Sequence, residues 1–276
     1  MDQDDAQIGR VLSRREVLEL FGAVGTAAAL VACAPGASSS GRASAAASAT
    51  AGASEGASAA TGATSGAASA SAIAVLPSCI VRPAETEGPY FVDEKLNRSD
   101  IRSDPSTGAV SEGARLDLTF AVARISGTSC TAYSDVLVDV WHCDALGVYS
   151  DVSDPGFQTS GKKFLRGYQV TNASGVAKFT TIVPGWYQGR TVHIHFKIRS
   201  DPASGSGLEF TSQLFFDDGA IDTIHANQPY AQKGQRTLRN AGDGIYQGGG
   251  DQLLLSLSGD GGGGYASSFD IRLQVA

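Results

Sequence analysis

Two histidines stand two residues apart in the stretch GRTVHIHFKI, which is otherwise rich in branched and aromatic side chains. Such a run predicts a β-strand, and side chains two apart in a strand project from the same face. His193 and His195 therefore share one face, while Val192, Ile194 and Phe196 share the other. The chain has 4 histidines in all, so their pairing here is informative. It indicates two imidazole ligands for one metal ion, with a half-exposed polar face as the alternative.

Two tyrosines near this strand could complete the coordination of a metal. Tyr149 follows a strand in WHCDALGVYSD, and Tyr187 lies in the turn IVPGWYQG, before the histidines. A turn tyrosine is ordinarily a packing residue with its hydroxyl in water. Here, however, loops on both sides of the histidine strand each offer a phenol. Phenolate is a hard anionic donor that suits Fe(III), whereas imidazole also accepts zinc or copper. Two tyrosines and two histidines together indicate ferric iron.

Four segments follow one another in a recognisable order and spacing. They are ETEGPYF, DVWHCDALGVYS, FLRGYQVTNASGVAKFTTIVPGWYQGRTVHIHFKI and TSQLFFDD. In this order they resemble the intradiol ring-cleavage dioxygenases, the non-haem Fe(III) enzymes that include protocatechuate 3,4-dioxygenase and catechol 1,2-dioxygenase. The likeness is greatest to the exported bacterial members of that family. It implies cleavage of a catechol ring between its two hydroxyl-bearing carbons by O2, to give a cis,cis-muconate-type diacid.

Four positions match the iron ligands of that family. They are occupied by Tyr149, Tyr187, His193 and His195. The resemblance implies that Tyr187 and His195 are axial and that the other two are equatorial. It also implies a catalytic role for Tyr187, which accepts a proton when the diol displaces it. No ligand is missing, so the expected cofactor is Fe(3+).

Other positions match residues that serve the substrate in the family. Arg190, three residues before the first histidine, matches an arginine that supports the reacting substrate, and Gln213 matches a glutamine near the iron. Gly88, Pro89 and Tyr90 match a segment that lines the substrate pocket. The resemblance therefore implies a small aromatic diol and O2 as substrates, with the charge of Arg190 stabilising negative charge on the ring.

Two other functions compete with this interpretation. A surface-tethered, non-catalytic β-sandwich that acts as a binding module would need none of the four ligands. A cupin-type metalloenzyme also carries H-x-H on a strand, but it needs a carboxylate shortly after the second histidine. Phe196, Lys197, Ile198 and Arg199 follow it here, so that pattern is incomplete. The ring-cleaving dioxygenase is favoured, and the choice of catechol is left open.

The elements that must position these residues are short strands. Alternating runs such as RLDLTFAVARI, DVLVDVWHC and GVAKFTTIV are separated by turns rich in Gly and Asp. This pattern predicts an all-β fold, a β-sandwich of mainly antiparallel strands. Residues 116–124 and 136–143 could pair as a hairpin. Residues 79–101 are expected to form an irregular N-terminal segment that packs across one end.

No amphipathic helix and no internal repeat is predicted in the folded part. Asp217 and Asp218 follow the strand TSQLFF, and paired acids in that position indicate a turn, with a cation site as the alternative. His225 lies in the polar sequence DTIHANQPY and is expected to be solvated.

The beginning of the chain resembles an export signal. Residues 1–33 carry the paired arginines of SRREVLEL ahead of an apolar run too short to span a bilayer, as in a twin-arginine export signal. The run ends in LVAC, so we expect lipidation at Cys33. Residues 34–72 are almost wholly Ala, Ser, Gly and Thr, which predicts a disordered linker. Residues 73–276 are the expected catalytic domain, exported and anchored by lipid to the outer face of the cytoplasmic membrane.

The net charge of the chain bears on the class of partner that it can bind. The net charge is -7 and no basic stripe is visible, which argues against nucleic acid. The oligomeric state is open between a monomer and a homo-oligomer.

An exported domain favours a disulfide. If residues 116–124 and 136–143 form a hairpin, a strand roughly 20 Å long separates Cys130 from Cys143, so Cys79 is expected in any bridge, with its partner undecided.

Overall fold

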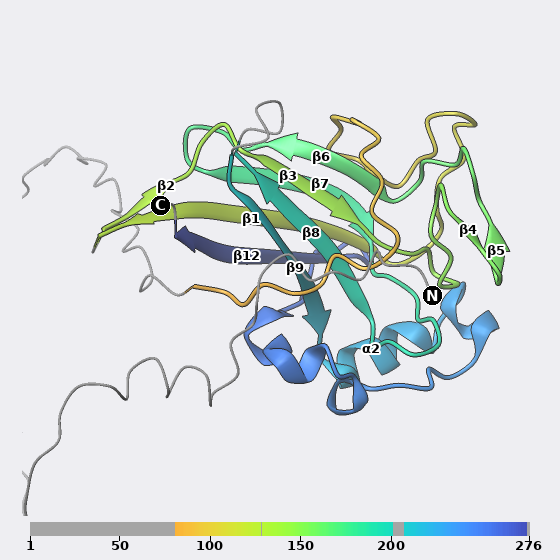
Figure 1. Cartoon of the computed structure of the whole chain (residues 1–276). Coiled ribbons are helices and arrows are strands. Elements are labelled where there is room, and N and C mark those ends of the chain that lie inside the picture. The colour runs from red at the N-terminus through yellow and green to blue at the C-terminus, as the bar shows by residue number, and fades with distance from the viewer. Residues whose placement is uncertain (1–80, 128, 201–206, 275–276) are drawn as a thin grey trace, which may run out of the picture. The chain divides into compact units, whose positions relative to one another are not determined.

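The computed structural model describes residues 81–127, 129–200 and 207–274 (Figure 1). The signal and linker expected in residues 1–72 lie outside the described residues, as do the lipidation expected at Cys33 and the bridge expected at Cys79. Within the described part, no helix is both long enough and apolar enough to cross a membrane.

The first sheet is built around its longest strand, β1 (Arg115–Ser126). Its order is β11-β12-β1-β2, and β7 also pairs with β1. β1 runs parallel to β12 (Tyr265–Gln274) and antiparallel to β2 (Ser129–Ala132) and β7 (Val176–Ile182). β11 (Ser258–Gly259) closes the edge beyond β12.

The second sheet carries the two histidines. Its order is β10-β9-β8-β3-β6, antiparallel throughout except between β10 and β9. Its strands are β3 (Leu137–Trp141), β6 (Arg166–Val170), β8 (His193–Arg199), β9 (Glu209–Phe216) and β10 (Leu254–Leu255). A separate two-stranded ribbon consists of β4 (Ser153–Asp154) and β5 (Phe157–Gln158).

The core lies between the two sheets. Phe120 of β1 contacts Phe179 of β7 and Phe269 of β12 within the first sheet, with ring centroids 6.0 and 6.4 Å apart. The Phe196 ring of β8 reaches across from the second sheet, 5.3 Å from Phe120. Alternate residues of β1 are buried, as expected for a strand with one face on a core. The predicted β-sandwich of mainly antiparallel strands is confirmed.

The irregular segment 81–101 crosses the second sheet on its other face. The Glu85 amide donates a hydrogen bond to the Thr211 carbonyl of β9 at 3.1 Å. Further along, Asp93 pairs with Arg199 of β8 at 2.9 Å. Because one face of β8 meets the core and this segment lies over the other, every residue of β8 is buried.

Residues 116–124 and 136–143 do not pair as a hairpin. β1 turns back into β2, whereas β3 joins the other sheet between β6 and β8. The alternating pattern identifies both strands correctly. It does not say which sheet each strand joins, because the apolar faces of both sheets meet in the same core.

A short helix that the sequence analysis did not predict follows β9. α2 (Asp218–His225) begins after Asp217, whose side chain accepts a hydrogen bond from the Ala220 amide at 2.9 Å. Asp217 is therefore an N-cap, and the assignment of both aspartates to a turn is wrong. His225, expected to be solvated, is buried with Nε2 2.9 Å from the Pro184 carbonyl. Four 3-10 helices follow: η2 (Tyr230–Lys233), η3 (Asn240–Gly242), η4 (Tyr246–Gly248) and η5 (Gly250–Leu253).

Candidate metal centre

The two histidines of β8 project away from the core. Ile194 and Phe196 enter the core, while His193 and His195 lie on the opposite face, each 2% exposed. His193 Nδ1 donates to the Thr191 carbonyl at 2.7 Å. Because a carbonyl can only accept, the proton is on Nδ1 and the Nε2 lone pair is left for another partner. The two Nε2 atoms lie 3.0 Å apart, so both imidazoles point to one position.

Both predicted tyrosines meet the histidines there. Tyr187, in the loop before β8, places its hydroxyl 3.2 Å from His193 Nε2. Tyr149, in the loop after β3, is 1% exposed, and its ring lies 5.7 Å from that of Tyr187. Within the described part of the chain, neither the Tyr149 hydroxyl nor His195 Nδ1 has a hydrogen bond of good geometry. We call Tyr149, Tyr187, His193 and His195 the four-donor centre.

Burial sets the charge of these four groups. It raises the pKa of Tyr149 well above its usual value, and the neighbouring Tyr187 raises it further. The pKa of Tyr187 is also raised by burial, against the charge of Arg190. Burial lowers the pKa of His193 to about 3 and that of His195 well below its usual value. The imidazoles are therefore neutral, as metal ligands must be, and the phenols ionise only beside a cation.

The donor set fits a ferric ion. Among the described residues, no group of three or more His, Cys, Asp and Glu side chains could hold a metal, so the tyrosines are essential to this centre. Two phenol oxygens and two imidazole nitrogens match the preference of a hard trivalent cation better than that of zinc or copper. A buried hydroxyl without a good hydrogen bond costs about 1–3 kcal/mol, and a bound cation would remove that cost for Tyr149.

Arg190 lies beside the four-donor centre between two polar partners. Its Nε donates to Asp243 Oδ2 at 2.9 Å and one terminal nitrogen donates to Gln213 Oε1 at 2.6 Å. Burial alone would raise the pKa of Asp243. Hydrogen bonds from the Thr191 and Tyr246 amides, together with the charge of Arg190, outweigh burial and hold that pKa below its usual value. The site therefore contains a fixed cation and its carboxylate counter-ion.

The segment predicted to line the pocket covers the histidines. A Cβ added at Gly88, whose φ is +73°, would lie 3.3 Å from His195 Cε1, so a side chain there would be strained and crowded. The Tyr90 ring lies 4.5 Å from the Tyr149 ring, and its hydroxyl donates to Asp154 of β4 at 2.8 Å. Pro89, between them, is exposed.

Three residues that the sequence analysis did not assign to the site support it. The Trp141 ring stacks on His195 at 5.0 Å, because β3 pairs the two residues directly. Arg166 is buried, and its guanidinium donates to both the Ser150 hydroxyl and the Ser150 carbonyl, next to Tyr149. Asp243 is the third. Trp141 could have been found from strand pairing, whereas Arg166 and Asp243 have no local pattern that marks them.

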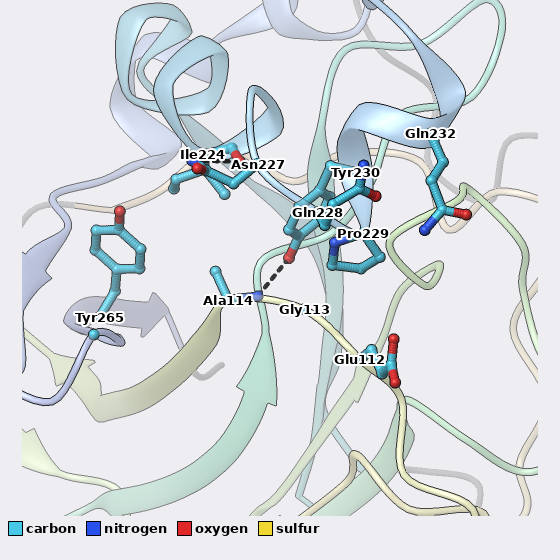
Figure 2. A pocket seen from close by; sticks show the side chains of 11 residues that line it. Glu112, Gly113, Ala114, Ile224, Asn227, Gln228, Pro229, Tyr230, Gln232 and Tyr265 are labelled. Atoms are coloured by element: carbon cyan, nitrogen blue, oxygen red, sulfur yellow. Dashed lines mark hydrogen bonds between the residues drawn. The ribbon is translucent and has the colours of Figure 1, made fainter.

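A cavity of about 670 Å³ lies elsewhere, by the chain just before β1 and the end of α2 (Figure 2). Glu112, Tyr230 and Tyr265 are among its lining residues. The Tyr230 hydroxyl accepts from the Ala114 amide at 2.9 Å, which fixes one wall. No residue of the four-donor centre lines this cavity, so its size does not make it part of the candidate site.

The two cysteines among the described residues, Cys130 and Cys143, lie outside the four-donor centre. Cys130 is disulfide-bonded. Cys143 is a free, buried thiol whose pKa is raised by burial, and its sulfur lies 3.5 Å from the Gly185 carbonyl. Neither side chain is among the four donors.

Comparison with known proteins identifies the family. Residues 86–274 match a family model described as Dioxygenase, and this match covers more than half of the chain. The chain belongs to the intradiol ring-cleavage dioxygenases. Members of this family depend on iron, which agrees with the donor set.

Three similar proteins differ in sequence identity to this intradiol dioxygenase and in the share of each chain that the match covers. The chain is 29% identical to an intradiol ring-cleavage dioxygenase from Tetranychus urticae, with a TM-score of 0.62 and coverage of 71% of this chain and 95% of that one. A dioxygenase domain from Streptomyces sp. SirexAA-E, part of a fusion with a carbohydrate-binding protein, is 27% identical, with a TM-score of 0.50 and coverage of 71% and 100%. Catechol 1,2-dioxygenase 1 from Acinetobacter lwoffii is 25% identical over 167 residues, 51% of this chain and 50% of that protein. The chain spans about half the length of this curated relative.

Proposed function

We propose that this chain is a non-haem Fe(III) dioxygenase that cleaves a catechol ring between its two hydroxyl-bearing carbons with O2, giving a cis,cis-muconate-type diacid. The observation that carries the proposal is the convergence of Tyr149, Tyr187, His193 and His195, in which the Tyr149 hydroxyl is buried without a good hydrogen bond. Membership of the family and the name of its curated relative support it.

Ferric iron held by these four residues would supply a Lewis acid for a catecholate. The chain prepares the ligands in advance. Thr191 holds the proton of His193 on Nδ1, so that Nε2 is ready to coordinate. Trp141 stacks on His195 and limits its rotation.

Tyr187 is the residue best suited to take a proton from the diol. It is less buried than Tyr149, so a diol can approach its hydroxyl more easily. Burial raises its pKa, so its phenolate form is a strong base. A diol hydroxyl beside Tyr187 can pass its proton to the Tyr187 oxygen.

Arg190 serves the negative charge that develops on the diol. A catechol that has lost both protons carries charge on its ring and oxygens, and a fixed cation in a site shielded from water stabilises that charge strongly. The Gly88–Tyr90 segment shields the site. Gly88 allows a close approach to His195, and Tyr90 ties the segment to the β4–β5 ribbon through Asp154.

The proposal is tested on the purified protein. A protein with iron bound to phenolates is expected to be red, to contain close to one iron per chain and to consume O2 when catechol is added. A panel of catechol, protocatechuate, hydroxyquinol and chlorinated or alkylated catechols identifies the substrate. A colourless protein without iron that binds a ligand unchanged would instead support the binding module considered above.

We also propose that the enzyme works outside the cytoplasm. The support is the order of sequence features in residues 1–33: paired arginines, an apolar run, small residues and Cys33. Lipidation of Cys33 would then tether the catalytic domain, residues 73–276, through the Ala/Ser/Gly/Thr-rich residues 34–72. Contact with the membrane would be through the lipid alone.

A further inference from the structure

Asp243 is a buried carboxylate 53 residues from Arg190 along the chain. It follows η3 directly and is 1% exposed. Its Oδ2 accepts from Arg190 Nε at 2.9 Å and from the Thr191 amide at 2.7 Å. Its Oδ1 accepts from the amides of Ile245 and Tyr246 at 2.8 and 3.1 Å. Each oxygen therefore has two donors, and the carboxylate cannot rotate without losing several hydrogen bonds.

The guanidinium of Arg190 is held from two sides. Asp243 binds Nε, and Gln213 Oε1 accepts from one terminal nitrogen at 2.6 Å. Gln213 is itself fixed, since its Nε2 donates to the Thr86 carbonyl at 2.8 Å. The other terminal nitrogen, Nη1, has no hydrogen-bond partner among the described residues and remains available to a substrate.

We propose that Asp243 is a positioning residue for ring cleavage, which holds the Arg190 guanidinium so that its available nitrogen meets the bound diol. This inference rests on the proposed function. Asp243 does not touch the diol and acts through Arg190. A long, flexible arginine would otherwise lose rotamer entropy when the reaction begins, whereas a guanidinium already fixed by a carboxylate and an amide does not. A fixed charge also needs no reorganisation as negative charge develops.

The same carboxylate joins Arg190 to the metal ligands. Its Oδ2 binds the Thr191 amide, and the Thr191 carbonyl accepts the proton of His193 Nδ1. The Thr191 hydroxyl donates to Asn240 Oδ1 at 2.7 Å, which provides a second anchor for the start of β8. We therefore expect His193 to keep its orientation when Asp243 is changed, whereas Arg190 loses its only ion pair with a carboxylate among the described residues.

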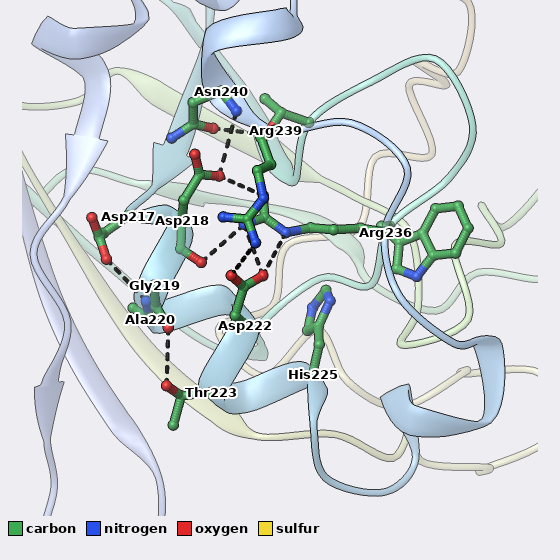
Figure 3. Close-up of polar contacts among 12 residues, drawn as sticks. Asp217, Asp218, Gly219, Ala220, Asp222, Thr223, His225, Arg236, Arg239 and Asn240 are labelled. Atoms are coloured by element: carbon green, nitrogen blue, oxygen red, sulfur yellow. Dashed lines mark hydrogen bonds and ion pairs between the residues drawn. The ribbon is translucent and has the colours of Figure 1, made fainter.

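The segment that carries Asp243 is anchored separately to α2 (Figure 3). Arg236 and Arg239 both bind Asp222, and Arg236 also binds Asp218. Asn240 Nδ2 donates to the Phe216 carbonyl at 2.7 Å. Asp222 offers a matched control, because it is a carboxylate bound to arginines that touches neither Arg190 nor the four-donor centre. Asp218 and the Phe216 carbonyl still hold the segment when Asp222 is changed.

The test compares Asp243→Asn with Asp222→Asn in the iron-loaded protein. Asparagine keeps the shape, but its amide nitrogen cannot accept, so the charge and two of the four hydrogen bonds are lost whichever way it faces. A misplaced catalytic group can cost about 10²-fold. For Asp243→Asn we expect kcat to fall roughly 10- to 100-fold, with iron content and the visible spectrum retained. The dissociation constant of catechol, titrated by absorbance without O2, should change less than about threefold. Asp222→Asn should keep kcat within about twofold.

A double-mutant cycle with Arg190→Ala tests whether Asp243 acts through Arg190. In the Arg190→Ala background, Asp243→Asn should cost less than about twofold more in kcat. A further tenfold loss there would overturn the inference, as would an unchanged kcat in Asp243→Asn alone. Loss of iron and of thermal stability with Asp243→Asn would show a structural role instead and would also overturn it. If the wild type cleaves diols and the variants give any of these overturning results, only the inference is rejected. If the iron-loaded wild type cleaves no diol, the proposed function and the inference are rejected together.

Discussion

At the scale of single residues, the most direct prediction concerns iron binding by Tyr149, because its hydroxyl is buried without a good hydrogen bond. Tyr149→Phe fills the same space and removes one donor. We expect at least about a tenfold loss of iron affinity, since even changes to residues that only support a ligand cost 10- to 100-fold. Tyr168→Phe, on β6 of the same sheet, is the control and should keep its iron. Full iron occupancy in Tyr149→Phe would reject the four-donor centre.

Changes to Arg190 are expected to affect turnover and not iron content. Arg190→Ala should leave iron in place and lower kcat by about 10²–10³, the usual cost of removing one group that stabilises developing charge. Arg190→Lys should restore only part of kcat, because a point charge lacks the planar fork that Asp243 and Gln213 hold. Steady-state kinetics and anaerobic titration separate turnover from binding. Equal losses in both would indicate that Arg190 simply anchors the substrate.

At the scale of elements, a buried ion pair joins β3 to β8. Arg199 donates to both oxygens of Asp139 at 2.9 and 2.8 Å and also binds Asp93 of the overlying segment. Arg199→Met leaves Asp139 buried without its partner, which typically costs about 3–5 kcal/mol of unfolding free energy. Breaking the exposed Arg102–Asp100 pair with Arg102→Met should cost less than about 1 kcal/mol. Urea unfolding of both variants measures the difference.

The same ion pair predicts a pH dependence. Burial raises the pKa of Asp139 to about 6, against the opposing effect of Arg199. A raised pKa in the folded state means that ionising Asp139 costs stability as the pH rises through about 6. Without Arg199 this pKa rises further. The loss of stability in Arg199→Met should therefore be larger near pH 8 than near pH 5. The same loss at both pH values would show that the charge of Asp139 is not the cause.

At the scale of the whole molecule, the proposed export is independent of the chemistry. Replacing Arg14 and Arg15 by lysine should leave active, iron-loaded enzyme in the cytoplasm, because a twin-arginine signal exports folded protein. Cys33→Ala should block lipidation and leave the N-terminus uncleaved. Cell fractionation and mass spectrometry of the N-terminus measure both. Wild-type protein found in the cytoplasm with an intact N-terminus would reject the proposed location and leave the four-donor centre untouched.

Local patterns in the sequence and the family resemblance were enough to predict most strands and the four side chains that the structure brings together. Alternation with a period of two places His193 and His195 on one face of β8, because neighbouring side chains of any strand point to opposite sides. The two tyrosines were predicted from residue type and from the family resemblance. α2 was missed, because eight residues after a strand carry too little periodicity to separate an N-capped helix from a turn.

Only the tertiary structure decided how these pieces meet. It assigns β3 to the second sheet instead of a hairpin with β1, and it brings the segment 81–101 over the outer face of β8. It also brings Asp243 to Arg190 across 53 residues. Each of these contacts depends on where distant parts of the chain pack, which strand alternation cannot specify because it describes only which face of a strand is apolar. The sequence by itself therefore determined which side chains could bind iron, and the packing of the two sheets decided which residues hold them in position.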